Sequence, residues 1–258
     1  MKIMKKMLLF AATLLLFASG TDAREREFIQ RTYHTSIGQD LPYQVLYPVN
    51  FDPAKKYPLI LFLHGAGERG TDGVEQTHHG RAVLASEATS GAIVVAPQCP
   101  WEDFWIRLPD RVNGMRTYPE NAPVSGSLLG VKELLDVMIS LGFVDEDALY
   151  CTGLSMGGMG TLDFVMRYPD FFAAVQPICG GINPERAKAY KGHTVFRFFH
   201  GLADDTVDPS GSIDTCKALV EGGHDATLVT YEGVSHNSWD NAFAEPDFIS
   251  WFFRYRKK

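Results

Sequence analysis

YCTGLSMGGMG, at residues 150–160, places Ser155 between Gly153 and Gly157. A serine held on a sharp strand-to-helix turn needs such neighbours, because a Cβ at either glycine position would crowd the turn. The pattern indicates a nucleophile elbow, in which the serine hydroxyl attacks a substrate carbonyl.

The residues on either side of Ser155 support this interpretation. Residues 148–152 form a short apolar run typical of a buried strand, and residues 156–167 have a helical composition that ends at Tyr168 and Pro169. Strand, serine and helix therefore follow in the order that an elbow requires. The alternative is a glycine-rich turn in which the serine only caps a helix.

Short apolar runs alternate with helical segments along most of the chain. Continuous apolar strands indicate burial on both faces, so the alternation predicts an α/β fold with a mostly parallel sheet and helices on both faces. Antiparallel strands are expected at 27–34 and 41–47. Further strands are expected at 57–63, 92–96, 149–151, 173–178, 195–199 and 226–231, and helices at 77–85, 125–141, 156–167, 212–222 and 247–254.

Residues 1–23 have the layout of a secretory signal peptide. Three lysines precede an apolar centre at 7–17, and small residues follow it. The centre is short for a transmembrane span, although a retained membrane anchor is the alternative. Residues 24–258 can form one large core and contain no linker, so we expect a single domain that is secreted or periplasmic.

The chain is acidic, with a formal net charge of -7. Removing residues 1–23 would take away three lysines and one aspartate and leave -9. Without clusters of basic residues, such a chain is a poor candidate for binding nucleic acid or an anionic membrane surface. The sequence leaves the oligomeric state open.

The four cysteines are Cys99, Cys151, Cys179 and Cys216. Cys151 and Cys179 lie in or beside apolar strand-like runs, where a free cysteine behaves as a small hydrophobic residue. One disulfide, with Cys151 and Cys179 or Cys99 as members, is the alternative. The spacings do not fit a zinc site, and we expect neither a metal nor a cofactor.

A serine nucleophile needs a histidine to accept its proton and a carboxylate to orient that histidine. His236 lies in a loop just after a strand-like run and is the expected base. The acid should come between the serine and the histidine, at the end of another strand. The loop there holds three candidates, Asp204, Asp205 and Asp208.

A glycine-rich turn at 64–70 follows the most apolar strand. Glycines let backbone amides approach a substrate oxygen, and an oxyanion hole needs one donor from this turn and one from the residue after the serine. We expect the N–H groups of Ala66 and Met156 to be these donors, with Gly67 as the alternative to Ala66. His64 is expected to support the turn.

With these residues assembled, the chain resembles the α/β-hydrolase superfamily. Within it, the chain looks like the small secreted esterases grouped with predicted peptidases, phospholipase/carboxylesterase-like proteins and carbohydrate esterase family one, which includes feruloyl and acetylxylan esterases. The resemblance covers nearly all of residues 24–258. The motifs that carry it are LHGAGERG at 63–70, APQCP at 96–100, GLSMGG at 153–158, HGLADDTV at 200–207 and SHNSW at 235–239.

The resemblance implies Ser155, Asp204 and His236 as the catalytic residues, because the family's acid falls four residues after the histidine of an HGxxDxxV motif. Asp205 and Asp208 stay as rivals, and His200 is expected only to shape the loop. The implied activity is carboxylic ester hydrolysis through an acyl-enzyme, with ferulate or acetate on plant polysaccharide as one substrate class.

Four residues near the predicted site are expected to contact substrate. Aromatic faces can stack on sugars or phenolic acyl groups, although packing is the alternative for each tryptophan. A local ion pair between Glu68 and Arg69 is expected to support the oxyanion turn. The expected substrate contacts are Gln98, Trp101, Trp105 and Trp239.

Two other functions stay open on the sequence alone. One is a non-catalytic carbohydrate-binding or scaffold module built on the same fold. The other is a serine peptidase, but prolyl-oligopeptidase relatives restrict access with a large propeller for which this chain has no room. Ester cleavage needs less assistance to the leaving group than amide cleavage does, so an open site favours esters.

Overall fold

A computed structural model describes residues 26–107, 111–112, 115–116 and 118–257, and the expected signal peptide at 1–23 lies outside these described residues. The main-sheet strands are β1 (Ile29–His34), β2 (Asp40–Leu46), β3 (Tyr57–Leu63), β4 (Ile93–Pro97), β7 (Val144–Leu154), β8 (Ala174–Ile178), β9 (Val195–Gly201) and β10 (Ala226–Tyr231). A separate antiparallel pair comprises β5 (Arg111–Val112) and β6 (Met115–Arg116).

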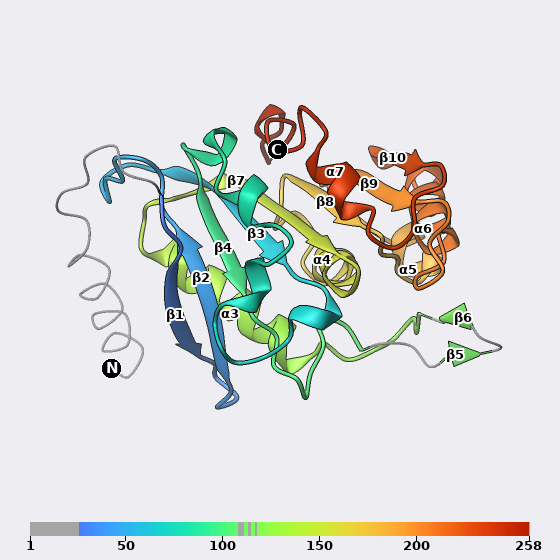
Figure 1. Cartoon of the computed structure of the whole chain (residues 1–258), viewed down its shortest axis with the longest axis horizontal. Helices are drawn as coiled ribbons and strands as arrows, with labels where there is room; N and C mark the ends of the chain where they lie inside the picture. Colours follow the sequence, from blue (N-terminus) through green and yellow to red (C-terminus); the bar gives the residue numbers. More distant parts are fainter. Residues whose placement is uncertain (1–25, 108–110, 113–114, 117, 258) are drawn as a thin grey trace.

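The eight main strands form one sheet in the order β1-β2-β4-β3-β7-β8-β9-β10 (Figure 1). Strand β2 is antiparallel to both β1 and β4, and the neighbours from β4 to β10 are parallel. The predicted fold class and the antiparallel N-terminal strands are therefore confirmed. The serine loop follows β7, near the middle of the sheet.

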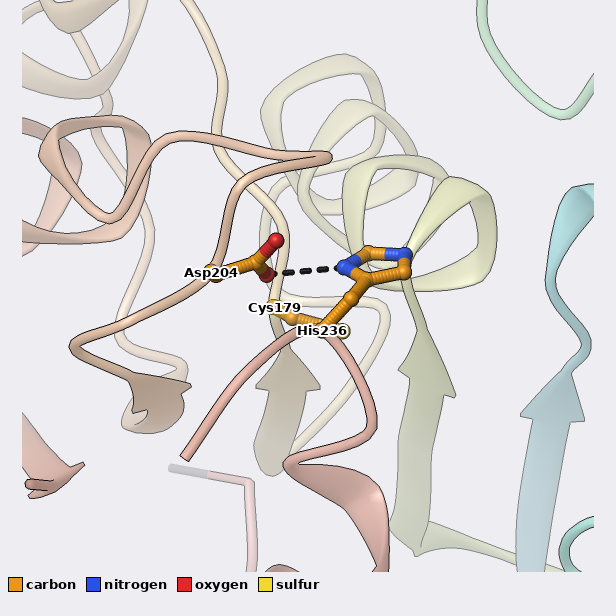
Figure 2. Close-up of side chains that lie close together, drawn as sticks. All are labelled: Cys179, Asp204 and His236. Atoms are coloured by element: carbon orange, nitrogen blue, oxygen red, sulfur yellow. Dashed lines mark hydrogen bonds and ion pairs between the residues drawn. The ribbon is translucent and has the colours of Figure 1, made fainter. Parts of the chain in front are cut away.

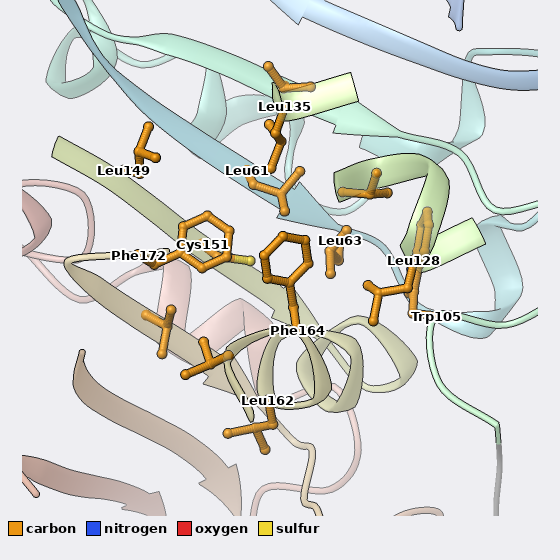
Figure 3. Close-up of a cluster of buried hydrophobic side chains, with 14 of the residues drawn as sticks. Leu61, Leu63, Trp105, Leu128, Leu135, Leu149, Cys151, Leu162, Phe164 and Phe172 are labelled. Carbon is orange, nitrogen blue, oxygen red and sulfur yellow. The ribbon is translucent and has the colours of Figure 1, made fainter. Parts of the chain in front are cut away.

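Each face of the sheet is covered by its own apolar layer. Side chains alternate between the faces along a strand, so Leu61 and Leu63 of β3 enter one layer while Ile60 and Phe62 enter the other. Figure 3 shows the first layer, where helix residues such as Phe164 pack on β3 and β7. This layer includes residues of α3 (Gly126–Ser140), α4 (Met156–Arg167), α5 (Pro184–Lys188) and α6 (Ser210–Glu221).

The opposite layer is built from shorter elements, and the two helices predicted there form only in part. The segment 77–85 is interrupted at Gly80, where a Cβ would come within 2.9 Å of the Phe62 ring. The segment 247–254 follows Pro246 as turns, and the Phe248 carbonyl, which would accept from Phe252 in an α-helix, accepts from the Gln176 side chain instead. The elements here are η2 (Glu75–Thr77), α2 (Arg81–Leu84), η3 (Glu87–Thr89), α7 (Trp239–Phe243) and η4 (Phe252–Arg254).

Within the described ranges, no helix combines the length and apolarity needed to cross a bilayer.

All four cysteines are buried and free, so the alternative of a disulfide does not apply. Burial raises the pKa of the Cys99 and Cys151 thiols to about 12. Thiols that stay protonated in an apolar surrounding are poor nucleophiles. The cysteines therefore serve the packing of the core.

We expect a thiol reagent to find four reactive groups in guanidinium chloride and almost none in the native protein. Dithiothreitol should leave the melting temperature unchanged. Reduction of a real disulfide would instead lower the free energy of unfolding by about 2–5 kcal/mol, and the melting temperature with it. A melting temperature that falls on reduction would contradict the free-thiol assignment.

Candidate active site

Ser155 occupies a strained turn between β7 and α4. Its backbone angles are φ 53° and ψ -116°, a region that residues with a side chain rarely adopt. The turn packs tightly against β3, since a Cβ built on Gly157 would lie 1.8 Å from the Leu63 carbonyl oxygen. The Ser155 amide donates to the carbonyl of Ile178 on β8 over 2.9 Å, which ties the turn to the next strand.

Three side chains that are distant in sequence form one hydrogen-bonded chain at this turn. His236 Nε2 lies 2.9 Å from Ser155 Oγ, and His236 Nδ1 lies 2.7 Å from Asp204 Oδ2 (Figure 2 shows the second contact). The ionised carboxylate can only accept a hydrogen bond, so Nδ1 carries the hydrogen. Nε2 is therefore free to accept the proton of Ser155. Asp204 follows β9 and His236 follows β10, so neighbouring parallel strands bring them together.

The surroundings of Asp204 keep it ionised. Burial of the carboxyl would raise its pKa, but hydrogen bonds from His200, His236 and the amides of Val207 and Thr206 outweigh this and hold the pKa well below its ordinary value. The two amides both donate to Oδ1 over 2.9 Å, which fixes the direction of the carboxylate. A permanently charged acceptor of this kind orients an imidazole and stabilises its protonated form.

The two rival aspartates lie elsewhere in the loop. Asp205 is exposed and accepts from the Thr206 hydroxyl over 3.3 Å, and Asp208 is exposed and accepts from the Ser210 amide over 2.8 Å. Among the three aspartates of the loop, Asp204 is the one whose carboxylate contacts His236.

The expected oxyanion donors are each the first residue of a helix. Ala66 begins η1 (Ala66–Glu68) and Met156 begins α4. The amide of a first helical residue has no acceptor within its own helix, so both N–H groups can point at a ligand.

His64 supports the turn that carries Ala66. It is buried, its Nδ1 lies 2.6 Å from the Gly65 carbonyl, and its Nε2 accepts from the Cys99 amide over 2.9 Å. Burial lowers the pKa of His64 to about 4, so the ring is neutral and can accept at Nε2. These bonds agree with the expected supporting role.

Two of the four expected substrate contacts are buried in the structure. The Gln98 side chain is fully buried and bonds to the Gly73 amide over 2.7 Å, so it holds the neighbouring loop. Trp105 is also fully buried and donates to the His64 carbonyl over 3.0 Å. Both expectations were wrong. A polar residue or a tryptophan that follows a strand can bind substrate, but it can equally hold neighbouring loops in place, as Gln98 and Trp105 do.

The other two tryptophans stay accessible. Trp101 is 57% exposed, and the Arg69 guanidinium stands 5.3 Å from its ring centroid. Trp239 is half-buried and meets the His236 ring edge-on, with 5.4 Å between the centroids. These rings provide apolar surface beside His236 and beside the oxyanion turn.

The expected Glu68–Arg69 ion pair does not form. Glu68 Oε1 instead lies 3.4 Å from His79 Nε2, and His79 packs on Trp239. Arg69 donates to the Ala66 carbonyl over 2.9 Å and covers the Phe104 ring. The two charged side chains still brace the oxyanion turn, but through different partners.

One buried thiol lies beside the hydrogen-bonded chain. Cys179 directly follows β8 and offers a sulfur within 4.8 Å of the nearest Asp204 oxygen and His236 nitrogen (Figure 2). Burial raises the pKa of this thiol well above its ordinary value. Because Asp204 and His236 already bond to each other, we interpret Cys179 as packing beneath them.

Sequence reasoning missed the contact between His200 and the acid. His200 is fully buried, and its Nε2 lies 3.1 Å from Asp204 Oδ2. The signal was present in the sequence, since His200 and Asp204 are only four residues apart at the end of a strand-like run.

Comparisons with known proteins identify the family of the chain. A family model described as "Putative esterase" matches residues 34–204. A solved structure titled as a thermostable esterase has a TM-score of 0.77 and 33% identity, over 89% of this chain and 63% of that chain. A structure titled ferulic acid esterase has a TM-score of 0.63 and 18% identity, over 89% of this chain and 100% of that one, and it supports the fold alone.

A curated relative is poly(3-hydroxyalkanoate) depolymerase C of Paucimonas lemoignei. It is 25% identical over 186 residues, which are 69% of this chain and 40% of the relative. The chain thus spans less than two thirds of this relative and of the thermostable esterase. Structural neighbours include peptidases as well as esterases. Since the family model covers more than half of the sequence, the chain belongs to the putative esterase family of the α/β-hydrolase superfamily.

Proposed function

We propose that this protein is a serine carboxylic ester hydrolase with Ser155 as nucleophile, His236 as general base and Asp204 as the acid that orients it. The observation that carries the proposal is the continuous chain of hydrogen bonds, 2.9 Å from Ser155 to His236 and 2.7 Å from His236 to Asp204. The strained turn and the two helix-terminal amides support it.

The reaction would proceed in two acyl-transfer steps. His236 Nε2 takes the proton of Ser155 Oγ as the oxygen attacks the ester carbonyl, and the N–H groups of Ala66 and Met156 stabilise the oxyanion. The protonated His236 then gives its proton to the departing alcohol, which leaves an acyl-serine. Water, deprotonated by the same histidine, attacks the acyl-serine, releases the carboxylic acid and restores Ser155.

Hydrolysis of p-nitrophenyl acetate tests the reaction class. We expect release of nitrophenol by the purified protein that far exceeds release by the Ser155→Ala variant under the same conditions. Equal rates for the two proteins would favour a non-catalytic carbohydrate-binding or scaffold module. A peptide-amide substrate measured in parallel separates an esterase from a peptidase.

For the substrate class, we propose an acylated plant polysaccharide, with a feruloyl or acetyl group as the acyl part. The accessible rings of Trp101 and Trp239 support this, because aromatic faces stack on sugars and on phenolic groups. Methyl ferulate, acetylated xylan and short aryl esters, ranked by kcat/KM, would identify the preferred acyl group. We further propose that residues 1–23 direct export and that 24–258 form one domain.

Trp101→Ala should raise KM for a feruloylated or acetylated polysaccharide several-fold while leaving kcat for p-nitrophenyl acetate nearly unchanged. The reason is that a remote aromatic contact contributes binding that is equal in the ground and transition states. Phe253→Ala removes another exposed ring, one that packs on Tyr150, and serves as the control. Equal KM values for wild type and Trp101→Ala on the polysaccharide would refute a substrate role for this ring.

A further inference from the structure

Asp204 contacts a second imidazole besides that of His236. His200, at the end of β9, is fully buried, and its Nε2 lies 3.1 Å from Asp204 Oδ2 and 3.0 Å from the Val207 carbonyl oxygen. Both of these atoms are acceptors when the carboxylate is ionised. Nε2 must therefore carry a hydrogen.

The other ring nitrogen of His200, Nδ1, faces the Ser212 hydroxyl, which already donates its proton to another acceptor. Nδ1 lies 2.7 Å from Ser212 Oγ on α6, and this oxygen lies 2.5 Å from the Gly180 carbonyl oxygen. Two oxygens at such a distance repel unless a proton lies between them, and a hydroxyl has only one proton to give. Ser212 thus donates to Gly180 and presents a lone pair to His200, so Nδ1 must carry a hydrogen as well.

We propose that His200 is a buried imidazolium that forms an ion pair with Asp204 and thereby sets how strongly the acid holds a proton on His236. A buried charge needs a partner of opposite sign, and the buried carboxylate of Asp204 supplies it. His200 does not touch the reacting atoms, so it is a positioning residue. The kinetic part of the inference rests on the proposed esterase function, but the charge state does not.

The consequence for His236 follows from electrostatics. His236 and His200 share the same oxygen, Oδ2 of Asp204, so the positive charge of His200 offsets part of the negative charge that His236 experiences. Without this offset, Asp204 would hold a proton on His236 more strongly. His236 could then act as a base only at higher pH.

Few other ionisable groups near His200 could produce the same effect. Asp208 is exposed and acts weakly on His200 from the loop after β9, and the Cys179 thiol just after β8 faces Asp204 with its proton retained. Ser212, which α6 contributes, does not titrate. The ion pair with Asp204 is therefore the dominant charge interaction of His200.

Nitrogen-15 NMR of the histidine rings tests the charge state in the resting protein, without any substrate. The His200 signals, assigned by their loss in His200→Asn, should show both ring nitrogens protonated from pH 6 to 8. One unprotonated ring nitrogen in that range would overturn the proposal. This result is independent of whether the protein hydrolyses esters, so it separates failure of this inference from failure of the proposed function.

The pH profile of kcat/KM tests the consequence for His236. In His200→Asn and in Ser212→Ala the acidic limb should move to higher pH, by roughly one unit for His200→Asn. His224→Gln is the matched control, because His224 bonds to the Tyr190 carbonyl away from the acid, and it should leave the limb unchanged. A lower rate with an unmoved acidic limb in both test variants would reduce His200 to a purely structural role and refute the proposal.

Discussion

Ser155→Ala should lower kcat/KM for ester hydrolysis roughly 10³-fold or more, since it removes the atom that forms the acyl intermediate. Folding should be little affected, because the Ser155 side chain is only partly buried and bonds to His236 instead of packing in the core. Steady-state kinetics and a melting curve on the same preparation separate the two effects.

The companion variant His236→Ala should cost a similar factor, because the serine hydroxyl is a weak nucleophile without its base. The double variant should be little worse than either single variant, since the two residues act as one unit. Losses that multiply, giving a double variant far less active than each single one, would contradict the assignment of these residues to one catalytic group.

Gly157→Ala should prevent correct folding of the elbow. Its Cβ would lie 1.8 Å from the Leu63 carbonyl oxygen and 2.7 Å from that of His64, and backbone atoms of a central strand cannot move aside cheaply. Overpacking against side chains costs about 1–3 kcal/mol, so a clash with backbone should cost more than about 3 kcal/mol. Urea unfolding, or soluble yield when the variant does not fold, measures this cost.

Gly91→Ala provides the matched control for this variant. The added Cβ meets no atom within 4 Å, and the backbone there does not require glycine, so the free energy of unfolding should change by no more than about 0.5 kcal/mol. Similar destabilisation in both variants would show that the close packing between Gly157 and β3 does not control the elbow.

Local patterns in the sequence predicted most of the sheet. The strand β3 and the strand β10 appear within a residue of the expected bounds, because each is a short apolar run between turn residues. The helix at α4 was equally clear, since Tyr168 and Pro169 mark its end. Such signals depend on neighbouring residues only, which is why the sequence reveals them.

The failed predictions concern residues whose role is set by tertiary contacts. Gln98 and Trp105 follow β4 as substrate-binding residues could, but their polar atoms bond to Gly73 and His64, which no local pattern indicates. The Glu68 carboxylate likewise pairs with His79 instead of Arg69, a tertiary contact that no local pattern indicates. The segment 247–254 has helical composition, but the Phe248 carbonyl bonds to the Gln176 side chain of β8 instead of continuing a helix.

The residues of the candidate site could be predicted from the sequence, but the hydrogen-bond network around Asp204 could not. The order of Ser155, an acid and His236 follows from the sequence, and the resemblance selected Asp204 from three aspartates. The proposed charge state of His200 could not be foreseen, because it depends on Ser212 of α6 and on the carbonyl of Gly180. Such a network exists only once β9, α6 and the β8 loop are packed together.

Mass spectrometry of the protein after treatment with a fluorophosphonate addresses the nucleophile directly. A single covalent adduct should form, and peptide mapping should locate it on Ser155, with no adduct in Ser155→Ala and very slow labelling in His236→Ala. An unmodified Ser155 in active protein, or an adduct that persists in Ser155→Ala, would contradict the account.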